Sequence, residues 1–120
     1  MSYIKSYVAS AGAAGTISAI ESSLDGSVTN GTYIIHTEAR FAFDIKGIYG
    51  LEHTSGTSTL AVQINGTDVT GLDAISVTAT AQDVVATGAN SVAVGDQITF
   101  VITSASSATD LNSTLEIERT

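Results

Sequence analysis

The residues that could carry out acid–base or metal chemistry are few and far apart in the sequence. The two histidines are His36 and His53, and the acidic residues nearest to them are Glu38 and Glu52. Neither histidine has a Cys, Asp or Glu at the spacing typical of a zinc site. We therefore interpret both as satisfied or exposed histidines, with a ring of histidines around an oligomer axis as the alternative.

Several aspartates lie beside turn residues. They are Asp68, Asp73, Asp83, Asp96 and Asp110. None belongs to a D-x-[DN]-x-[DN]-G loop, the pattern that converges several oxygens on a calcium ion. Short polar side chains are favoured in turns because they hydrogen-bond to nearby backbone, so we assign these carboxylates to turns and loops. A calcium ion held between loops or subunits is the alternative, and we predict no metal site.

The sequence contains no arrangement typical of an enzyme. It has no Cys, which excludes thiol catalysis, disulfides and Cys-ligated metals, and no G-x-S-x-G nucleophile elbow. A pair of acids for glycosidic cleavage would have to come from Glu38, Asp44 or Glu52, and there is no Trp to stack on a sugar. We predict that the chain is not an enzyme and holds no cofactor.

The charge of the chain narrows the choice of partners. Its 120 residues suffice for one domain, and the formal net charge is −8. The cations Lys5, Arg40, Lys46 and Arg119 are scattered, so they cannot form the basic footprint that binding to nucleic acid or an anionic membrane requires. No apolar run is long enough for a transmembrane helix, and no signal peptide is visible. If the protein works outside the cell that makes it, we expect release by assembly and lysis.

Alternating apolar and polar residues predict strands along most of the chain. The expected segments are residues 16–30 with a turn at Asp25-Gly26, then 32–38, 39–49, 58–65, 74–80, 83–87, 97–104 and 111–118. The clearest alternation puts Ala39, Phe41, Phe43 and Ile45 on one side. About eight short strands without a helix predict an all-β, jelly-roll-like antiparallel β-sandwich, a single domain over residues 16–120.

The same alternation predicts which side chains point inward. The expected inward positions are Leu60, Val62 and Ile64, then Ile98, Phe100 and Ile102, then Leu111, Leu115 and Ile117.

Two turns have specific signals in the sequence. Asn65-Gly66 suits a type I′ hairpin, because both central residues of that turn need positive φ. Gly95 permits a tight bend, and we expect Asp96 to cap the backbone amides that follow it.

The first 15 residues differ from the rest of the chain. Tyr3, Ile4, Tyr7 and Val8 precede a tract of small residues that ends at Gly15. Glycines in this tract would interrupt a helix. We predict that residues 1–15 are an N-terminal arm that orders on a partner, with a first edge strand as the alternative.

About two thirds of the chain, residues 41–119, resembles a known family. Residues 92–100 follow the pattern V-x-V-G-D-x-[ILV]-T-[ILVF], a Ser/Ala-rich hairpin follows at 104–110, and residues 111–119 form a strand of the L-x-x-x-L-x-[IY]-x-R type. Together with residues 57–80, these segments resemble small β-sandwich modules of tailed-bacteriophage virion proteins, among them fibre tips, head fibres and capsid decoration proteins. The V-G-D step is also similar to complement-head and tumour-necrosis-factor-like jelly rolls, which are trimers.

The resemblance implies a function. We expect a homotrimeric virion structural protein, a decoration or cement protein that binds the major capsid protein on the outer surface of the capsid. Tyr3, Ile4, Tyr7 and Val8 of the arm would bury apolar side chains in the shell or add a strand to it.

Two other functions stay open. The first is the receptor-binding head of a phage fibre that recognises a bacterial surface glycan, with Tyr33, Tyr49 and the loops near 54–57 and 104–110 as contacts. The second is a bacterial adhesin or pilus-like module.

Overall fold

The computed structural model describes residues 4–8 and 12–120, and in these ranges every regular element is a β-strand. The strands are β1 (Ile4–Val8), β2 (Ile17–Ser27), β3 (Gly31–His36), β4 (Phe43–Ile64), β5 (Thr67–Asp68), β6 (Ile75–Val77), β7 (Gln82–Val85), β8 (Ser91–Val92) and β9 (Ile98–Arg119). They form one sheet with the order β1-β2-β9-β4-β5, and every pairing is antiparallel. The predicted all-β class is confirmed. Within the described ranges, no helix could cross a membrane.

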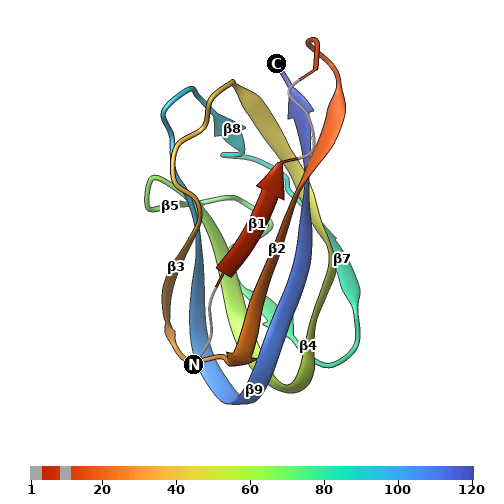
Figure 1. Cartoon of the computed structure of the whole chain (residues 1–120), viewed down its shortest axis with the longest axis vertical. Helices are drawn as coiled ribbons and strands as arrows, with labels where there is room; N and C mark the ends of the chain where they lie inside the picture. The colour runs from red at the N-terminus through yellow and green to blue at the C-terminus, as the bar shows by residue number, and fades with distance from the viewer. Residues whose placement is uncertain (1–3, 9–11) are drawn as a thin grey trace.

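Two long paired strands organise the sheet. β4 and β9 each contain 22 residues and pair along almost their whole length. A straight strand of that length would span about 70 Å, whereas the longest dimension of the molecule is 41 Å. The β4–β9 ribbon therefore has to fold back on itself, and both strands turn through a U at the lower end of Figure 1.

Folding the ribbon back produces two layers. The layer that we call the acidic layer contains β1, β2, β7, β8 and the ribbon residues 43–53 and 110–119. The layer that we call the neutral layer contains β3, β5, β6 and the ribbon residues 58–64 and 98–103. The single sheet is thus a sandwich of two faces that cover one another.

The core fills the space between the layers. Its largest fully buried side chains include Phe43, Ile48 and Leu51 of the acidic layer and Phe100 and Leu60 of the neutral layer. Burying each such side chain contributes roughly 1.5–3 kcal/mol, so this core is the main source of stability. All the positions predicted to point inward on residues 60–64, 98–102 and 111–117 are buried.

The predicted strand boundaries are wrong where the ribbon bends. Residues 39–49 and 58–65 were expected as separate strands, but β4 runs through both, and β9 likewise joins 97–104 to 111–118. The two strands stay paired through the bend by means of register shifts between Tyr49 and Thr59. Bulges let a strand curve without losing its partner, which explains why turn residues here do not end the strands.

The strand predicted over residues 39–49 begins only at Phe43. Ala39 is held by a loop instead of a neighbouring strand: its amide donates to Asp96 O at 2.8 Å, and its carbonyl accepts from Gly95 N at 2.7 Å. Phe41 lies half-buried beside Phe43, with ring centroids 5.5 Å apart. Alternation of apolar and polar residues does not distinguish a strand from an extended segment whose backbone is hydrogen-bonded to a loop.

The turn predictions met different outcomes. Asn65 and Gly66 have φ of 50° and 82°, so the hairpin from β4 to β5 is confirmed, and Gly95 bends the chain with φ of 94°. Asp96 was expected to cap amides that follow it, but its Oδ2 accepts from Ala93 N, which precedes it, at 2.9 Å. At Asp25-Gly26 strand β2 continues to Ser27 through an irregularity in its pairing with β9.

Candidate functional site

The bend of the β4–β9 ribbon has an unusual backbone. Ser104, Ser107 and Asp110 on β9 have φ of 51°, 48° and 49°, a left-handed conformation that is uncommon for residues other than Gly. On β4, Gly56 has φ of 78°, and a Cβ at this position would overlap the backbone of Ser107. The bend therefore depends on close contact between the two backbones, which only Gly56 permits.

The side chain of Asp110 ties three strands together at this bend. Its Oδ1 accepts from Gly26 N of β2 at 2.7 Å, and its Oδ2 accepts from Thr54 Oγ1 of β4 at 2.9 Å. The bond from the Gly26 amide has the larger effect and the bond from Thr54 the smaller. Both favour the ionised carboxylate and lower the pKa of Asp110 below its ordinary value. Asp110 thus has a structural role, as the assignment of this residue to a loop anticipated.

His53 lies in the core behind the bend, and only 1% of its surface is exposed. Its Nδ1 donates to the carbonyl of Asp110 at 2.7 Å, since a carbonyl oxygen can only accept. Its Nε2 lies 2.7 Å from Ser58 Oγ, which can then donate to it. The prediction of a satisfied histidine is confirmed here, and both ring nitrogens are used inside the fold.

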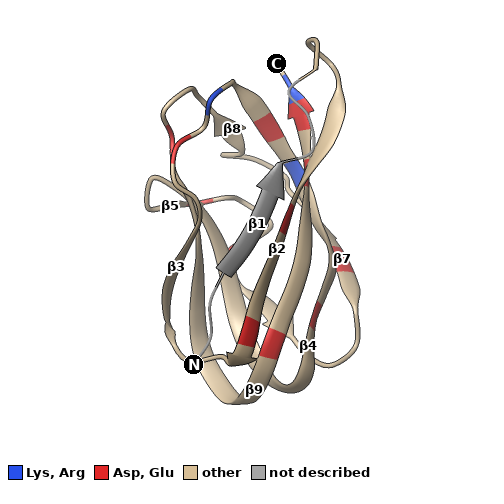
Figure 2. Ribbon diagram, in the orientation of Figure 1, with Lys and Arg blue, Asp and Glu red and all other residues tan. Residues whose placement is uncertain are grey.

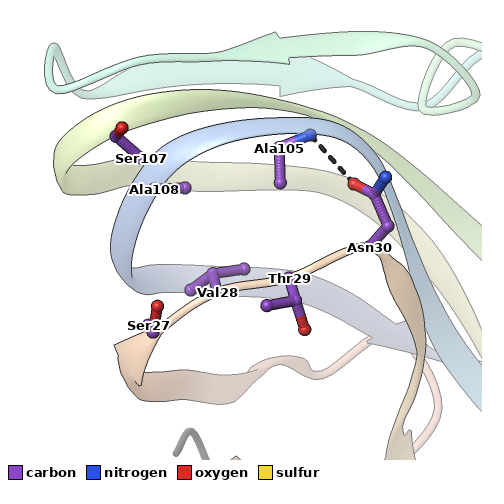
Figure 3. Close-up of a pocket in the computed structure, with 7 residues that line it drawn as sticks. All are labelled: Ser27, Val28, Thr29, Asn30, Ala105, Ser107 and Ala108. Atoms are coloured by element: carbon purple, nitrogen blue, oxygen red, sulfur yellow. Dashed lines mark hydrogen bonds between the residues drawn. The ribbon is translucent and has the colours of Figure 1, made fainter.

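An open hollow of ≈ 440 Å³ lies beside the bend (Figure 3). Its lining residues come from the β2–β3 connection and from the bend of β9: Ser27, Val28, Thr29, Asn30, Ala105, Ser107 and Ala108. Asn30 Oδ1 accepts from Ala105 N at 2.9 Å and joins the two segments. The lining offers hydroxyls, an amide and small apolar groups without a charge, a set that suits a neutral hydroxylated ligand.

The structure brings together part of the predicted glycan-contacting set. The loops near 54–57 and 104–110 pair with each other at the bend, where Ser55 lies opposite Thr109. Tyr33 is near the hollow, because its hydroxyl donates to the carbonyl of Thr29 at 2.6 Å. Tyr49 is not part of this cluster, since it lies in the acidic layer opposite Thr114. Sequence reasoning missed Asn30, whose partner is 75 residues away along the chain.

Three of the four predicted attachment residues, Ile4, Tyr7 and Val8, fall in the first strand. The backbone of β1 pairs antiparallel with β2, with Ile4 opposite Leu24, Tyr7 opposite Glu21 and Val8 opposite Ile20. Tyr3 lies outside the described residues. β1 occupies the end of the sheet, as the edge-strand alternative has it. Docking of this segment on a partner stays a prediction.

The outer face of the acidic layer carries carboxylates from four strands of the sheet, β2, β4, β7 and β9. We call this set the acidic face, and it consists of Glu21, Asp44, Glu52, Asp83, Glu116 and Glu118. Asp44 and Glu118 lie directly opposite one another, and Lys46 Nζ approaches Glu118 Oε2 at 3.9 Å. Like charges at opposed positions repel, so this face favours contact with water.

The outer face of the neutral layer has the opposite character. We call it the neutral face, and it consists of Thr32, Ile34, Thr59, Ala61, Gln63, Thr99, Val101 and Thr103. Two of its cross-strand rows are Ile34–Thr99–Gln63 and Thr32–Val101–Ala61. The ribbons of β3 and of the adjacent half of β9 carry no charged segment in Figure 2. Asp68 of β5 lies at the rim, where its Oδ1 accepts from Gln63 Nε2 at 2.8 Å.

His36 is the last residue of β3. Burial lowers the pKa of His36 below its ordinary value, because a charged ring would lose part of its hydration. Its ring lies against Phe43 with centroids 6.3 Å apart. At neutral pH this histidine therefore adds little charge to the layer.

No group of three or more His, Asp or Glu side chains converges as a metal site within residues 12–120. No family model, no curated protein and no solved structure matches this chain.

Proposed function

We propose that this chain is a structural protein of a bacteriophage virion, a decoration (cement) protein that binds the major capsid protein on the outer surface of the shell. The observation that carries the proposal is the contrast between the acidic face and the neutral face. The central part of a protein interface is depleted of charged residues, whereas a surface left in water tolerates them. A subunit packed against other proteins on one side and solvated on the other needs this asymmetry.

The attachment to the shell is assigned to the N-terminal residues. β1 is an edge strand, and among the described residues it pairs with β2 alone. An edge strand presents unpaired backbone groups that can hydrogen-bond to a strand of another protein. Tyr3, Ile4, Tyr7 and Val8 would supply the apolar contacts that accompany this pairing.

The proposal includes a trimer of jelly-roll-like subunits that sits over junctions between capsomers. Three copies that each contact two neighbours form a closed ring, which limits assembly to a defined size. Burial between subunits would add stability that depends on the concentration of the chain.

Removing residues 2–14 tests the attachment. Purified empty capsid shells of the phage that encodes the chain are mixed with the protein and sedimented, and bound protein is measured. We expect the truncated chain to lose shell binding by at least about tenfold, because the contacts removed belong to the arm. Its oligomeric state and its β-type circular dichroism should stay the same. Undiminished binding contradicts the assignment of the arm.

The truncation also uncovers the edge of β2, so a second variant is needed. Tyr7→Ser keeps the backbone of β1 and removes one large side chain of the arm, at the position paired with the exposed residue Glu21. We expect the same loss of shell binding from this variant.

The position of the gene adds an independent check, since a cement protein is expected beside the major capsid gene and a fibre protein beside tail genes.

The hollow at the bend favours a second candidate function, the recognition of a bacterial surface glycan by a fibre head. Neutral hydroxyls and one amide beside Ala and Val methyl groups match the polar and apolar patches of a sugar. A glycan array probed with the full chain tests this function. We expect binding that Asn30→Ala weakens if the fibre assignment is correct, and no signal if the chain only decorates capsids.

A further inference from the structure

The asparagine that lines the open hollow is followed by a glycine, and such a pair is open to a chemical change that needs no enzyme. The sequence has two of these pairs, Asn30-Gly31 and Asn65-Gly66, whereas the other two asparagines precede Ser. Because Gly has no Cβ, its backbone nitrogen can approach the side-chain amide of the preceding Asn closely. We propose that Asn30 is a site of spontaneous deamidation in the folded protein, whereas the fold protects Asn65. This inference goes beyond the proposed function and does not depend on it.

The reaction balances with water as the sole co-reactant. The Gly31 nitrogen forms a bond to Cγ of Asn30 and gives its proton to water. The bond from Cγ to Nδ2 breaks, and Nδ2 takes up a proton and leaves as ammonia. Water then opens the cyclic imide at either of its two carbonyls. The product is aspartate or, where the main chain comes to run through the side chain, isoaspartate, and nothing is oxidised or reduced.

The side-chain amide of Asn30 is held in a way that favours this attack. Its Oδ1 accepts from Ala105 N at 2.9 Å, the bond drawn in Figure 3. Negative charge develops on this oxygen when the nitrogen attacks Cγ, and a fixed backbone N–H directed at such an oxygen stabilises that charge. Within residues 4–8 and 12–120, no hydrogen bond holds Nδ2, the atom that has to leave.

Asn30 also has water and space around it. The side chain is exposed and lines the open hollow of ≈ 440 Å³, where its neighbours include the small residues Ala105 and Ser107. Gly31 is the first residue of β3, and the ends of strands open more readily than their middles. The attack therefore needs local opening at one end of β3 and no change in the core.

The side-chain amide of Asn65 is held at both of its polar atoms. Its Oδ1 accepts from Gln97 N at 2.9 Å, and its Nδ2 donates to Asp96 Oδ1 at 2.8 Å. Both asparagines thus have a backbone N–H on Oδ1, and the difference between them lies at Nδ2. An ionised carboxylate only accepts hydrogen bonds, so Asp96 supplies no proton to a departing nitrogen. Its bond to Nδ2 is charge-assisted, which makes it one of the stronger kinds of hydrogen bond.

Deamidation would change the chemistry of the hollow. A carboxylate at position 30 still accepts from Ala105 N, so we expect the fold to persist. The new group places a negative charge in a lining that has none among the residues that form it. Isoaspartate also lengthens the main chain between β2 and β3. A stored sample would therefore contain chains with a neutral hollow and chains with an acidic one.

Mass spectrometry of proteolytic peptides tests the proposal on the full chain. The protein is kept in mildly alkaline buffer, in one sample folded and in another unfolded by urea, and the acid forms of Asn30 and Asn65 are followed with time. In the folded chain we expect Asn30 to convert at least about tenfold faster, a ratio that corresponds to one hydrogen bond of ordinary strength. In urea the two sites should convert at similar rates, because both are then Asn-Gly steps in an open chain.

The remaining outcomes overturn the proposal. Equal rates in the folded chain, faster conversion at Asn65, or no conversion at Asn30 would each show that the fold does not select this site. A preference for Asn30 that persists unchanged in urea would also contradict the proposal, since neighbours in the sequence would then be its cause.

The variant Asp96→Ala tests the cause of the protection, because it removes the acceptor of Asn65 Nδ2. We expect the rate at Asn65, relative to that at Asn30 in the same sample, to rise by at least about tenfold. Asp68→Ala is the matched control, since the Asp68 carboxylate binds Gln63 instead and its loss should leave the ratio unchanged. Circular dichroism during the incubation checks that both variants stay folded. A folded Asp96→Ala chain with an unchanged ratio would show that the bond to Asp96 does not protect Asn65.

Discussion

The acidic face and the neutral face share the two long strands β4 and β9, yet they have opposite surface chemistry. In β4 the outward residues of the first half include Asp44, Lys46 and Glu52, and those of the second half include Ala61 and Gln63. β9 reverses this order, with Thr99 and Val101 first and Glu116 and Glu118 last. Because the strands are antiparallel, charged halves pair with charged halves and neutral halves with neutral halves.

The contrast shows what the bend contributes. Along each strand, alternation decides which side chains point inward and which point outward. Alternation does not decide on which side of the molecule an outward side chain lies. The bend at residues 54–57 and 104–109 places the two halves of the ribbon in different layers. A difference along the sequence thereby becomes a difference between two faces.

The largest effect is expected from breaking the bend that separates the faces. In Gly56→Ala the added methyl group overlaps the backbone of Ser107 and strains a residue with φ of 78°. We expect a loss of about 3 kcal/mol in the free energy of unfolding, measured by urea denaturation.

Gly50→Ala is the matched control for this prediction. Gly50 also has positive φ, at 59°, but a Cβ there meets nothing within 4 Å. Its loss should be about 1 kcal/mol, which is the cost of the left-handed backbone alone. Equal losses for the two variants would show that the close contact at the bend contributes nothing.

An intermediate effect is expected from acid, which acts on the aspartate that holds the bend. Since the pKa of Asp110 is lowered in the folded protein, its ionised form stabilises the fold at neutral pH. This contribution is present above the ordinary aspartate pKa of about 4 and is lost as the pH falls through the lowered value. We expect the thermal midpoint to fall in this acidic range.

The variant Asp110→Asn sharpens the measurement. It should be less stable than the unaltered chain at pH 7, because its NH₂ group cannot accept from Thr54, and its midpoint should change less below about pH 4. Asp96→Asn is a companion variant, because the pKa of Asp96 is also lowered in the folded protein. The hydrogen bond from the Ala93 amide lowers it most, and the hydrogen bond from Asn65 comes second. If the thermal midpoint of Asp110→Asn depends on pH as strongly as that of the unaltered chain, protonation of Asp110 is not a cause of the loss of stability in acid.

The smallest effect is expected from buried hydroxyls that lack a hydrogen-bond partner within the described residues, and we compare one such hydroxyl from each layer. Thr99 Oγ1 on the neutral layer and Ser113 Oγ on the acidic layer have no hydrogen-bond partner within the described residues. Thr99→Val and Ser113→Ala remove a desolvated polar group without breaking a bond, so each should raise the unfolding free energy by about 0.5–1 kcal/mol. A decrease in calorimetry for either variant would show that its hydroxyl has a partner, such as water.

Particular residues show how far the sequence alone predicts this fold. The inward positions of β9 and the Asn65-Gly66 hairpin were predictable, because alternation and positive φ are local requirements. The continuity of β4 and β9 was not. Ser104 and Ser107 adopt left-handed backbone that no residue preference signals, and the register through the bend depends on contacts between segments far apart in the chain.

The candidate site was less predictable than the fold. The loops near 54–57 and 104–110 were recognised as candidates, and the structure pairs them. The hollow beside them also needs the β2–β3 connection, whose residue Asn30 reaches Ala105 across the molecule. Nothing local in the sequence indicates such a partnership.

By itself the sequence determined that this is an all-β protein with a negative net charge and few charged residues. Alternation is a property of neighbouring residues, and charge follows from composition, so neither needs the tertiary structure. Only the tertiary structure decided that the carboxylates of β2, β4, β7 and β9 gather on one face of the molecule. The physical reason is the folding of a long paired ribbon over its own core: it buries the inward side chains of both halves together, and it leaves their outward side chains facing opposite directions.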